Sequence, residues 1–127
     1  MSGLSLLAVT WLLGTSEPSA CARFEPAKEV IVGKLVRRTL EGETGWYVAL
    51  EKPLCVKGEP SDDINADDVS DVRLLQLVLM HDEYATDKDL VGKRVRVSGT
   101  LFTAHTGHHH TPVLITVEEL TLASPAR

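Results

Sequence analysis

The chain has 127 residues, of which 43% are hydrophobic and 24% are charged, and its formal net charge is −5. This composition indicates one domain with a packed core and excludes a disordered chain. The negative charge argues against binding to a phosphate backbone or to an anionic membrane surface. We therefore expect no nucleic-acid partner and no stable membrane insertion.

The N-terminal segment has the composition of a secretory signal. Leu4–Gly14 is an apolar run that is too short to span a bilayer. Small residues permit cleavage after Ser16, which we prefer. We predict a signal peptide over residues 1–16, a single domain over residues 17–127, and a periplasmic or secreted protein. The alternative is a buried N-terminal helix.

The two cysteines, Cys21 and Cys55, are an even number, as is usual where an exported protein forms a disulfide. Small residues also permit cleavage after Ala20 or Ala22. A cut after Ala22 would discard Cys21 and leave Cys55 alone, which is why cleavage after Ser16 is preferred. We predict a Cys21–Cys55 disulfide, and the alternative is two unpaired thiols.

The first half of the domain reads as a hairpin. Glu29–Arg38 and Trp46–Glu51 are rich in β-branched and aromatic residues and predict two strands. The segment Leu40–Gly45 between them carries two glycines and predicts a turn. Pro53 marks the place where pairing of the second strand is expected to stop.

The second half adds three strands and a helix. Lys57–Val69 is turn-rich and acidic, and predicts an exposed loop. Asp71–Met80 predicts a strand buried on both faces, and His81–Leu90 predicts a short helix. Alternating apolar residues then predict strands over Lys93–Thr103 and Pro112–Leu122.

The predicted order is β-β-β-α-β-β, which is the order of the OB-fold. We therefore predict an all-β fold with one short helix, organised as an OB-fold-like five-stranded barrel. Another small β-barrel or a β-sandwich is the alternative.

Four of the five histidines lie in residues 104–112, the segment A-H-T-G-H-H-H-T-P, here called the histidine loop. It joins the last two predicted strands. In an OB barrel, the loops between strands one and two and between strands four and five flank the ligand-binding face. The histidine loop is therefore expected at a binding edge.

Imidazole is the commonest metal ligand in proteins. His108 and His110 are two residues apart and would project to one side of an extended segment. Gly107 would let the chain bring His105 back toward them. These three histidines are the candidate ligands if the loop binds zinc or copper, with nickel as another candidate metal. His109 and His81 are further candidate ligands.

Ahead of metal binding, we favour a role without metal for these histidines, either in recognition or as a structural loop. Ring nitrogens would then bond to backbone carbonyls and to the hydroxyls of Thr103, Thr106 and Thr111. The spacing H-x-x-H-H-H matches no established zinc signature, and the loop contains no carboxylate.

The sequence contains no catalytic signature such as G-x-S-x-G or H-E-x-x-H. The acids that follow the loop, Glu118 and Glu119, lie along the last strand, and a metal hydrolase needs a base beside its metal. We expect no enzymatic activity and assign no catalytic or cofactor-binding residue. A metal-dependent hydrolase is the weakest alternative.

Other notable side chains have two readings each. The aromatic residues of the strands predict core packing, with stacking on a ligand as the alternative: Trp46, Tyr47 and Phe102. The basic residues of the first and fourth strands predict a solvated face, with a basic stripe as the alternative: Arg37, Arg38, Lys93, Arg94 and Arg96. The acids within residues 62–68 resemble a calcium loop faintly but lack its glycine and terminal glutamate.

The sequence also resembles a family of small, exported bacterial domains of unknown function. The matching pieces are Cys21–Pro26, Lys52–Val56, Val72–Leu79 and above all Leu90–Leu114, which includes the histidine loop. The resemblance implies export and supports the cysteine pairing, and it implies no activity. The first hairpin turn, Thr39–Gly45, is shorter than the family pattern.

We therefore predict an exported, non-enzymatic binding domain with the histidine loop at its binding edge. Its partner would be a protein or a small ligand. A metal-binding module of the cell envelope is the alternative.

Overall fold

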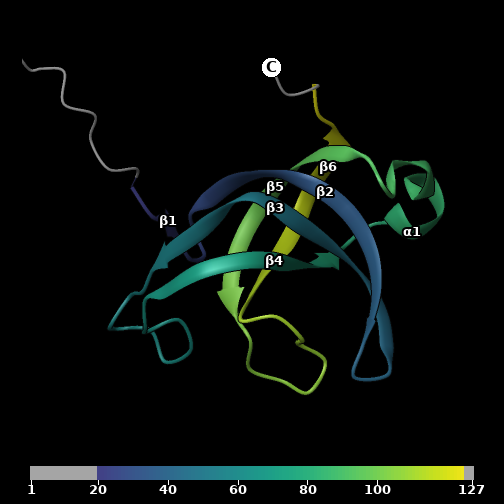
Figure 1. Ribbon diagram of the computed structural model, residues 1–127. Coiled ribbons are helices and arrows are strands. Elements are labelled where there is room, and N and C mark those ends of the chain that lie inside the picture. The colour runs from purple at the N-terminus through teal and green to yellow at the C-terminus, as the bar shows by residue number, and fades with distance from the viewer. Residues whose placement is uncertain (1–19, 125–127) are drawn as a thin grey trace, which may run out of the picture.

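Five long strands form a closed ring of backbone pairing in the computed structural model, which describes residues 20–124. The strands are β2 (Lys28–Leu40), β3 (Glu43–Lys57), β4 (Val69–Leu79), β5 (Arg94–Thr103) and β6 (Val113–Leu122). Pairing runs from β2 through β3, β4, β6 and β5 back to β2, with only β4 and β6 parallel among these pairs (Figure 1). This is the order of the OB barrel, so the predicted fold is confirmed.

A sixth strand that the sequence did not predict lies at the N-terminal end. β1 (Ala22–Arg23) pairs in parallel with the end of β3. The next residue, Phe24, is buried in the core and forms a bridge to Leu101 of β5. The short strand lies at the side of the barrel away from the helix (Figure 1).

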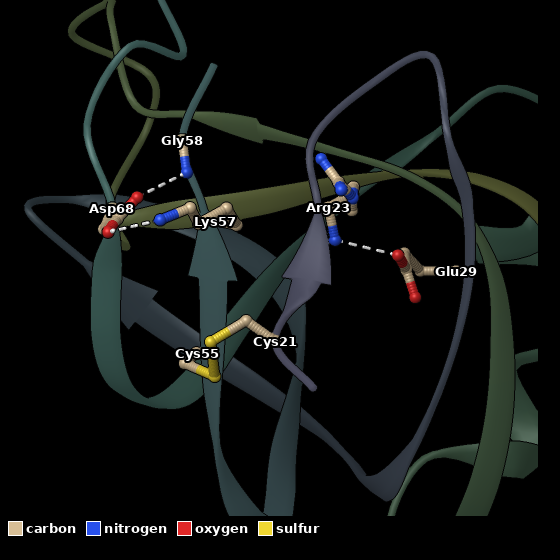
Figure 2. Close-up of a disulfide and its surroundings, with 7 residues drawn as sticks. All are labelled: Cys21, Arg23, Glu29, Cys55, Lys57, Gly58 and Asp68. Atoms are coloured by element: carbon tan, nitrogen blue, oxygen red, sulfur yellow. Dashed lines mark hydrogen bonds and ion pairs between the residues drawn. A yellow bond between two sulfur atoms is a disulfide. The ribbon is translucent and has the colours of Figure 1, made fainter. Parts of the chain in front are cut away.

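The predicted disulfide is confirmed. Cys21 and Cys55 are bonded, their Cα atoms lie 4.9 Å apart, and the bond ties the segment before β1 to β3 (Figure 2). Beside it, Asp68 accepts a hydrogen bond from the Gly58 amide at 2.8 Å and forms an ion pair with Lys57 at 3.6 Å. The signal peptide predicted over residues 1–16 lies outside the described residues.

The hairpin turn between β2 and β3 is tighter than the sequence predicted. Leu40 pairs directly with Glu43, so the turn comprises only Glu41 and Gly42, both with positive φ (51° and 83°). A two-residue turn of this kind matches the twist of a hairpin. The predicted turn over Leu40–Gly45 was too long, because residues 43–45 already belong to β3.

β3 also continues further than predicted. Its pairing with β2 ends at Leu50, close to Pro53, as expected. The strand nevertheless runs on to Lys57, because its other edge resumes pairing with β4 after an irregularity between Ala49 and Leu54. Proline removes one donor, and the irregularity accommodates that loss.

The predicted helix is present but divided. α1 (Glu83–Thr86) is followed by a 3-10 turn, η2 (Lys88–Leu90). Neither N-terminus receives a hydrogen bond from a capping side chain. The segment therefore lacks the stabilisation that would favour one longer helix. No helix among residues 20–124 is long and apolar enough to cross a membrane.

The interior of the barrel is filled from all five long strands. Each contributes a side chain with almost no exposed surface: Leu35, Val48, Leu75, Val97 and Ile115. Full burial of such a side chain stabilises the fold by about 1.5–3 kcal/mol. Trp46 is buried in this core, as predicted, whereas Tyr47 and Phe102 are buried on the outer face of the barrel and do not belong to the core.

The acidic loop between β3 and β4 is only partly the exposed loop that was predicted. Asn65 is 1% exposed. Its Oδ1 accepts hydrogen bonds from the Thr103 amide (2.8 Å) and hydroxyl (2.9 Å), and its Nδ2 donates to Glu25 (3.2 Å). Asp62 accepts from the amides of Ile64 and Asn65, which lowers its pKa. The carboxylate of Asp62 therefore stabilises the conformation of the loop itself.

Candidate binding rim around the histidine loop

A row of four cross-strand neighbours lies on the outer face of the barrel beneath the histidine loop. Tyr47 pairs with Gln76, Gln76 with Leu114, and Leu114 with Phe102. Side chains at paired positions share a face of the sheet. Tyr47, Leu114 and Phe102 are buried but do not belong to the core cluster, whose members alternate with them along the strands. The row is therefore covered from outside, and burial raises the pKa of Tyr47.

Gln76 fastens the histidine loop to this face. Its Nε2 donates to the His108 carbonyl at 3.0 Å, and its Oε1 accepts from the His110 amide at 2.6 Å. Thr111 adds a second attachment, because its hydroxyl accepts from the Gln76 amide and donates to the Val113 carbonyl. The loop is thus tied to β4 as well as to the two strands that it joins.

The first part of the loop packs on Phe102. The rings of His105 and His109 both contact Phe102 edge-on, and their own centroids are 4.7 Å apart. His109 Nδ1 accepts hydrogen bonds from the amides of His105 (3.0 Å) and Thr106 (3.2 Å). A nitrogen that accepts cannot carry a proton, so this ring is neutral. Burial lowers the pKa of His109, and the neighbouring histidines lower it further.

The next histidine is in the opposite state. His110 Nδ1 faces the carboxylate of Glu41, and its Nε2 faces that of Glu43 at 2.7 Å. Because both nitrogens face acceptors, both must carry protons, and the ring is an imidazolium. The hydrogen bonds to Glu43 and then Glu41 raise the pKa of His110. The His110 side chain is 3% exposed, whereas those of Glu41 and Glu43 are 74% and 45% exposed, so solvent still reaches the ion pairs from the carboxylate side.

Glu43 joins two histidines at once. One carboxylate oxygen contacts His110, and the other contacts His108 Nδ1 at 2.7 Å. These contacts hold the pKa of Glu43 below its ordinary value of 4.5. The His108 side chain is 81% exposed. The histidine loop and the β2–β3 turn lie on the same side of the barrel (Figure 1), and these contacts join them into one edge, called the rim here and comprising residues 41–43 and 104–112.

The candidate metal ligands do not all meet. His108 and His110 share Glu43, whereas the His105 ring bonds to the Thr103 carbonyl at 2.9 Å and packs on His109. Among residues 20–124, no three His, Cys, Asp or Glu side chains are grouped so that they could hold a metal ion. Metal binding by the predicted set stays a prediction.

The fifth histidine lies apart from the rim. His81 follows β4, its amide donates to Glu83 at 2.8 Å, and its ring lies 3.4 Å from the same carboxylate. Glu83 is buried at the start of α1 and accepts both contacts. His81 therefore orders the entry to the helix.

Sequence reasoning missed the three residues that hold the loop: Glu41, Glu43 and Gln76. The signal for them was present, because two acids flank the glycine of the hairpin turn opposite a histidine cluster. Gln76 was visible as a polar residue within an apolar strand. The contacts of Glu43 with His108 and His110 span 65 and 67 residues of sequence, and no local sequence pattern encodes contacts at such a separation.

The basic residues do not act as one stripe. Arg94 bonds to Glu51 through two nitrogens, at 2.5 and 3.2 Å, and this pairing raises its pKa and lowers that of Glu51. Arg96 and Lys93 are exposed, in agreement with a solvated face. Arg37 instead lines a cavity, together with Lys88.

Residues 74–121 match the model of a family described as a domain of unknown function (DUF4431). The match spans most of β4, the helical segment, β5, the histidine loop and nearly all of β6. It confirms the resemblance to a family of small domains of unknown function. A search of curated proteins finds no match.

Among solved structures, the chain is similar to a small single-stranded DNA-binding protein from Streptomyces coelicolor. The identity is 18%, the match covers 76% of this chain and 92% of the other, and the TM-score is 0.38. The expected exclusion of nucleic-acid partners is contradicted by this likeness. The physical reason is that net charge is summed over the whole chain, whereas a ligand meets the local charge of one face. A likeness at this TM-score assigns no ligand to the present chain.

Proposed function

We propose that this chain is an exported binding domain whose recognition surface is the rim. The observation that carries the proposal is the double contact of Glu43 with His108 and His110. It joins the two loops that flank the binding face of an OB barrel into one edge. His108 is exposed there and offers a ring nitrogen to a ligand.

The rim combines fixed and accessible groups, as a recognition surface requires. His110 and Gln76 are held by several hydrogen bonds and set the shape of the edge. His105, Thr106 and His108 are exposed beside them. Rigid placement lowers the entropy lost on binding, because the groups that meet a ligand are already ordered.

The experiment is an NMR titration of the mature protein with defined probes. OB barrels bind oligosaccharides and oligonucleotides at this edge. A neutral trisaccharide and a short oligothymidylate are therefore the first two probes. We expect amide shifts to cluster at residues 41–43 and 104–112, and His108→Ala to weaken the bound probe about tenfold, the effect of one lost hydrogen bond.

His81→Ala is the matched control. His81 is exposed, lies outside the rim, and pairs through Nδ1 with a glutamate, as His108 does. It should leave the affinity unchanged. Shifts that cluster away from the rim, or equal losses for both variants, would contradict the proposal.

Export is part of the proposal. The Cys21–Cys55 disulfide supports it, since disulfides persist in oxidising compartments. The apolar run Leu4–Gly14 supports it as well. The intact mass of protein recovered from the periplasm should correspond to a chain that begins at Glu17. Recovery of uncleaved chain in the cytoplasm would contradict export.

The alternative is a metal-binding module of the cell envelope, with His105, His108 and His110 as ligands of zinc or copper. It rests on the density of imidazoles in the loop. Binding would require the three rings to converge and His110 to release its proton and leave Glu43. Protein purified without an affinity tag should then contain about one equivalent of metal, and H105A should release it. Metal-free protein with only weak affinity would reject this alternative.

A further inference from the structure

The opposite side of the β2–β3 hairpin faces a cavity of about 580 Å³, away from the rim. Ligand sites in proteins commonly have volumes of about 300–1,000 Å³. One wall comes from the hairpin and the other from the helical segment after β4. The lining residues are Arg37, Thr44, Trp46, Tyr84, Lys88 and Val91.

The cavity has an unneutralised positive charge at its walls. Arg37 of β2 and Lys88 of η2 are both exposed. Within residues 20–124, neither forms an ion pair or a side-chain hydrogen bond, unlike Arg94 with Glu51. The acids next to Lys88 in the sequence, Asp87 and Asp89, do not line the cavity. Two free cations from different elements therefore line one half-open cavity, which favours an anionic group.

Two aromatic rings, those of Trp46 and Tyr84, belong to the lining. Trp46 is 3% exposed, and Tyr84 is 53% exposed. The rings meet edge to face, with centroids 4.9 Å apart and planes at 66°. Both rings line the cavity, and Tyr84 keeps exposed surface there. Tyrosine offers a flat apolar body with a polar hydroxyl at its tip.

A hydroxyl from the hairpin completes the lining. Thr44 Oγ1 lies 2.7 Å from Thr39 Oγ1, and the two hydroxyl groups form one hydrogen bond in which either can be the donor. One further hydroxyl proton and free lone pairs remain for a ligand. The cavity thus offers positive charge, one open ring face and hydroxyl groups within a single space.

We propose that this cavity binds an acidic sugar. The carboxylate or phosphate lies between Arg37 and Lys88, and the apolar face of the sugar ring rests on Tyr84. The ring hydroxyls meet Thr44 and the tyrosine hydroxyl. This site is separate from the rim, because its residues lie on the other face of the hairpin, and it does not depend on the function proposed above.

The experiment compares four probes by NMR titration of the disulfide-bonded protein: glucuronic acid, glucose 1-phosphate, glucose and inorganic phosphate. The two acidic sugars share the proposed chemistry, and comparing them shows which anion is preferred. Glucose lacks the charge, and phosphate lacks the ring. We expect at least one acidic sugar to bind about tenfold more tightly than both controls, with shifts at the cavity residues.

Variants locate the site. R37Q and K88Q should each weaken the acidic sugar about tenfold, and Y84A should weaken glucose 1-phosphate more than inorganic phosphate. R38Q is the matched control. It removes the same charge as R37Q, but Arg38, which is exposed next to Arg37, does not line the cavity. The affinity of R38Q for the acidic sugar should match that of the unmodified protein.

Three results would overturn the proposal. The first is an absence of cavity shifts up to about 10 mM of either acidic sugar. The second is an equal loss in R38Q and R37Q, which would show that long-range charge alone attracts the anion. The third is that neither acidic sugar binds more tightly than inorganic phosphate, which would show that the ring is not recognised.

Discussion

His110 lies between two carboxylates, and its contact with Glu43 spans 67 residues of sequence. The preceding residue, His109, instead accepts hydrogen bonds from two backbone amides. Two adjacent histidines are therefore held in opposite protonation states by their surroundings. This contrast makes the histidine loop testable residue by residue.

The two rings should titrate on opposite sides of the ordinary histidine pKa of 6.5. His110 should lose its proton above that value, because Glu43 and Glu41 stabilise the imidazolium. His109 should gain a proton only below it, because burial disfavours the charge and its Nδ1 is already an acceptor. Ring-resonance NMR as a function of pH measures both. A Glu43→Gln variant should bring the pKa of His110 down, and an unchanged value would contradict the assignment.

Stability should depend on pH through the His110–Glu43 pair. The pKa of His110 is raised in the folded protein, so its contribution is complete below 6.5 and is lost as the pH rises through the folded value. The pKa of Glu43 is lowered from 4.5, so its contribution is present above 4.5 and is lost as the pH falls through the folded value. Both contributions are therefore present between pH 4.5 and 6.5.

Urea unfolding of the unmodified protein and of His110→Gln tests this expectation. The stability difference between them should be larger near pH 6 than at a pH above the folded pKa of His110, as measured in the NMR titration. Because His109 is present in both proteins, its opposing effect cancels in the comparison. A difference that does not change with pH would show that the ion pairs do not stabilise the fold.

Asn65→Ala should destabilise the protein by about 1–3 kcal/mol. The substitution removes the acceptor of the Thr103 amide and hydroxyl at a buried position, and an unsatisfied buried donor has a cost of this size. Asp63→Ala in the same loop is the control, since Asp63 is exposed and should change stability by less than about 0.5 kcal/mol. Equal effects in thermal unfolding would contradict the anchoring role of Asn65.

Replacing both Cys21 and Cys55 with serine should lower the free energy of unfolding by about 4 kcal/mol. The estimate follows from the chain-entropy model with a separation of 34 residues. Reduction of the unmodified protein should give a similar loss in urea. If the oxidised and reduced proteins unfold at the same urea concentration, the bond does not stabilise the barrel.

Gly99→Ala should cost about 2–3 kcal/mol, because an added Cβ would lie 1.9 Å from the Thr116 carbonyl oxygen where β5 and β6 shift register. Gly107→Ala is the matched control, since no atom lies within 4 Å of the Cβ position in the histidine loop. Thermal unfolding compares them. A tolerated Gly99→Ala would mean that the strands separate readily at this point.

The sequence alone determined the order of strands and the type of barrel. Residues 94–103 and 113–122 alternate at period two, and that period places one face of each strand inside. The disulfide was also predictable, because only one pairing exists for two cysteines. β1 was missed, because two residues carry no periodicity.

Only the tertiary structure decided how the histidines are used. Local spacing suggested that His105, His108 and His110 form one set, but packing on Phe102 and pairing with Glu43 divide them into two groups. The cavity between Arg37 and Lys88 was invisible for the same reason, since its walls come from β2–β3 and η2. Periodicity fixes which face a side chain occupies, whereas its partner depends on which distant strand or loop folds against that face.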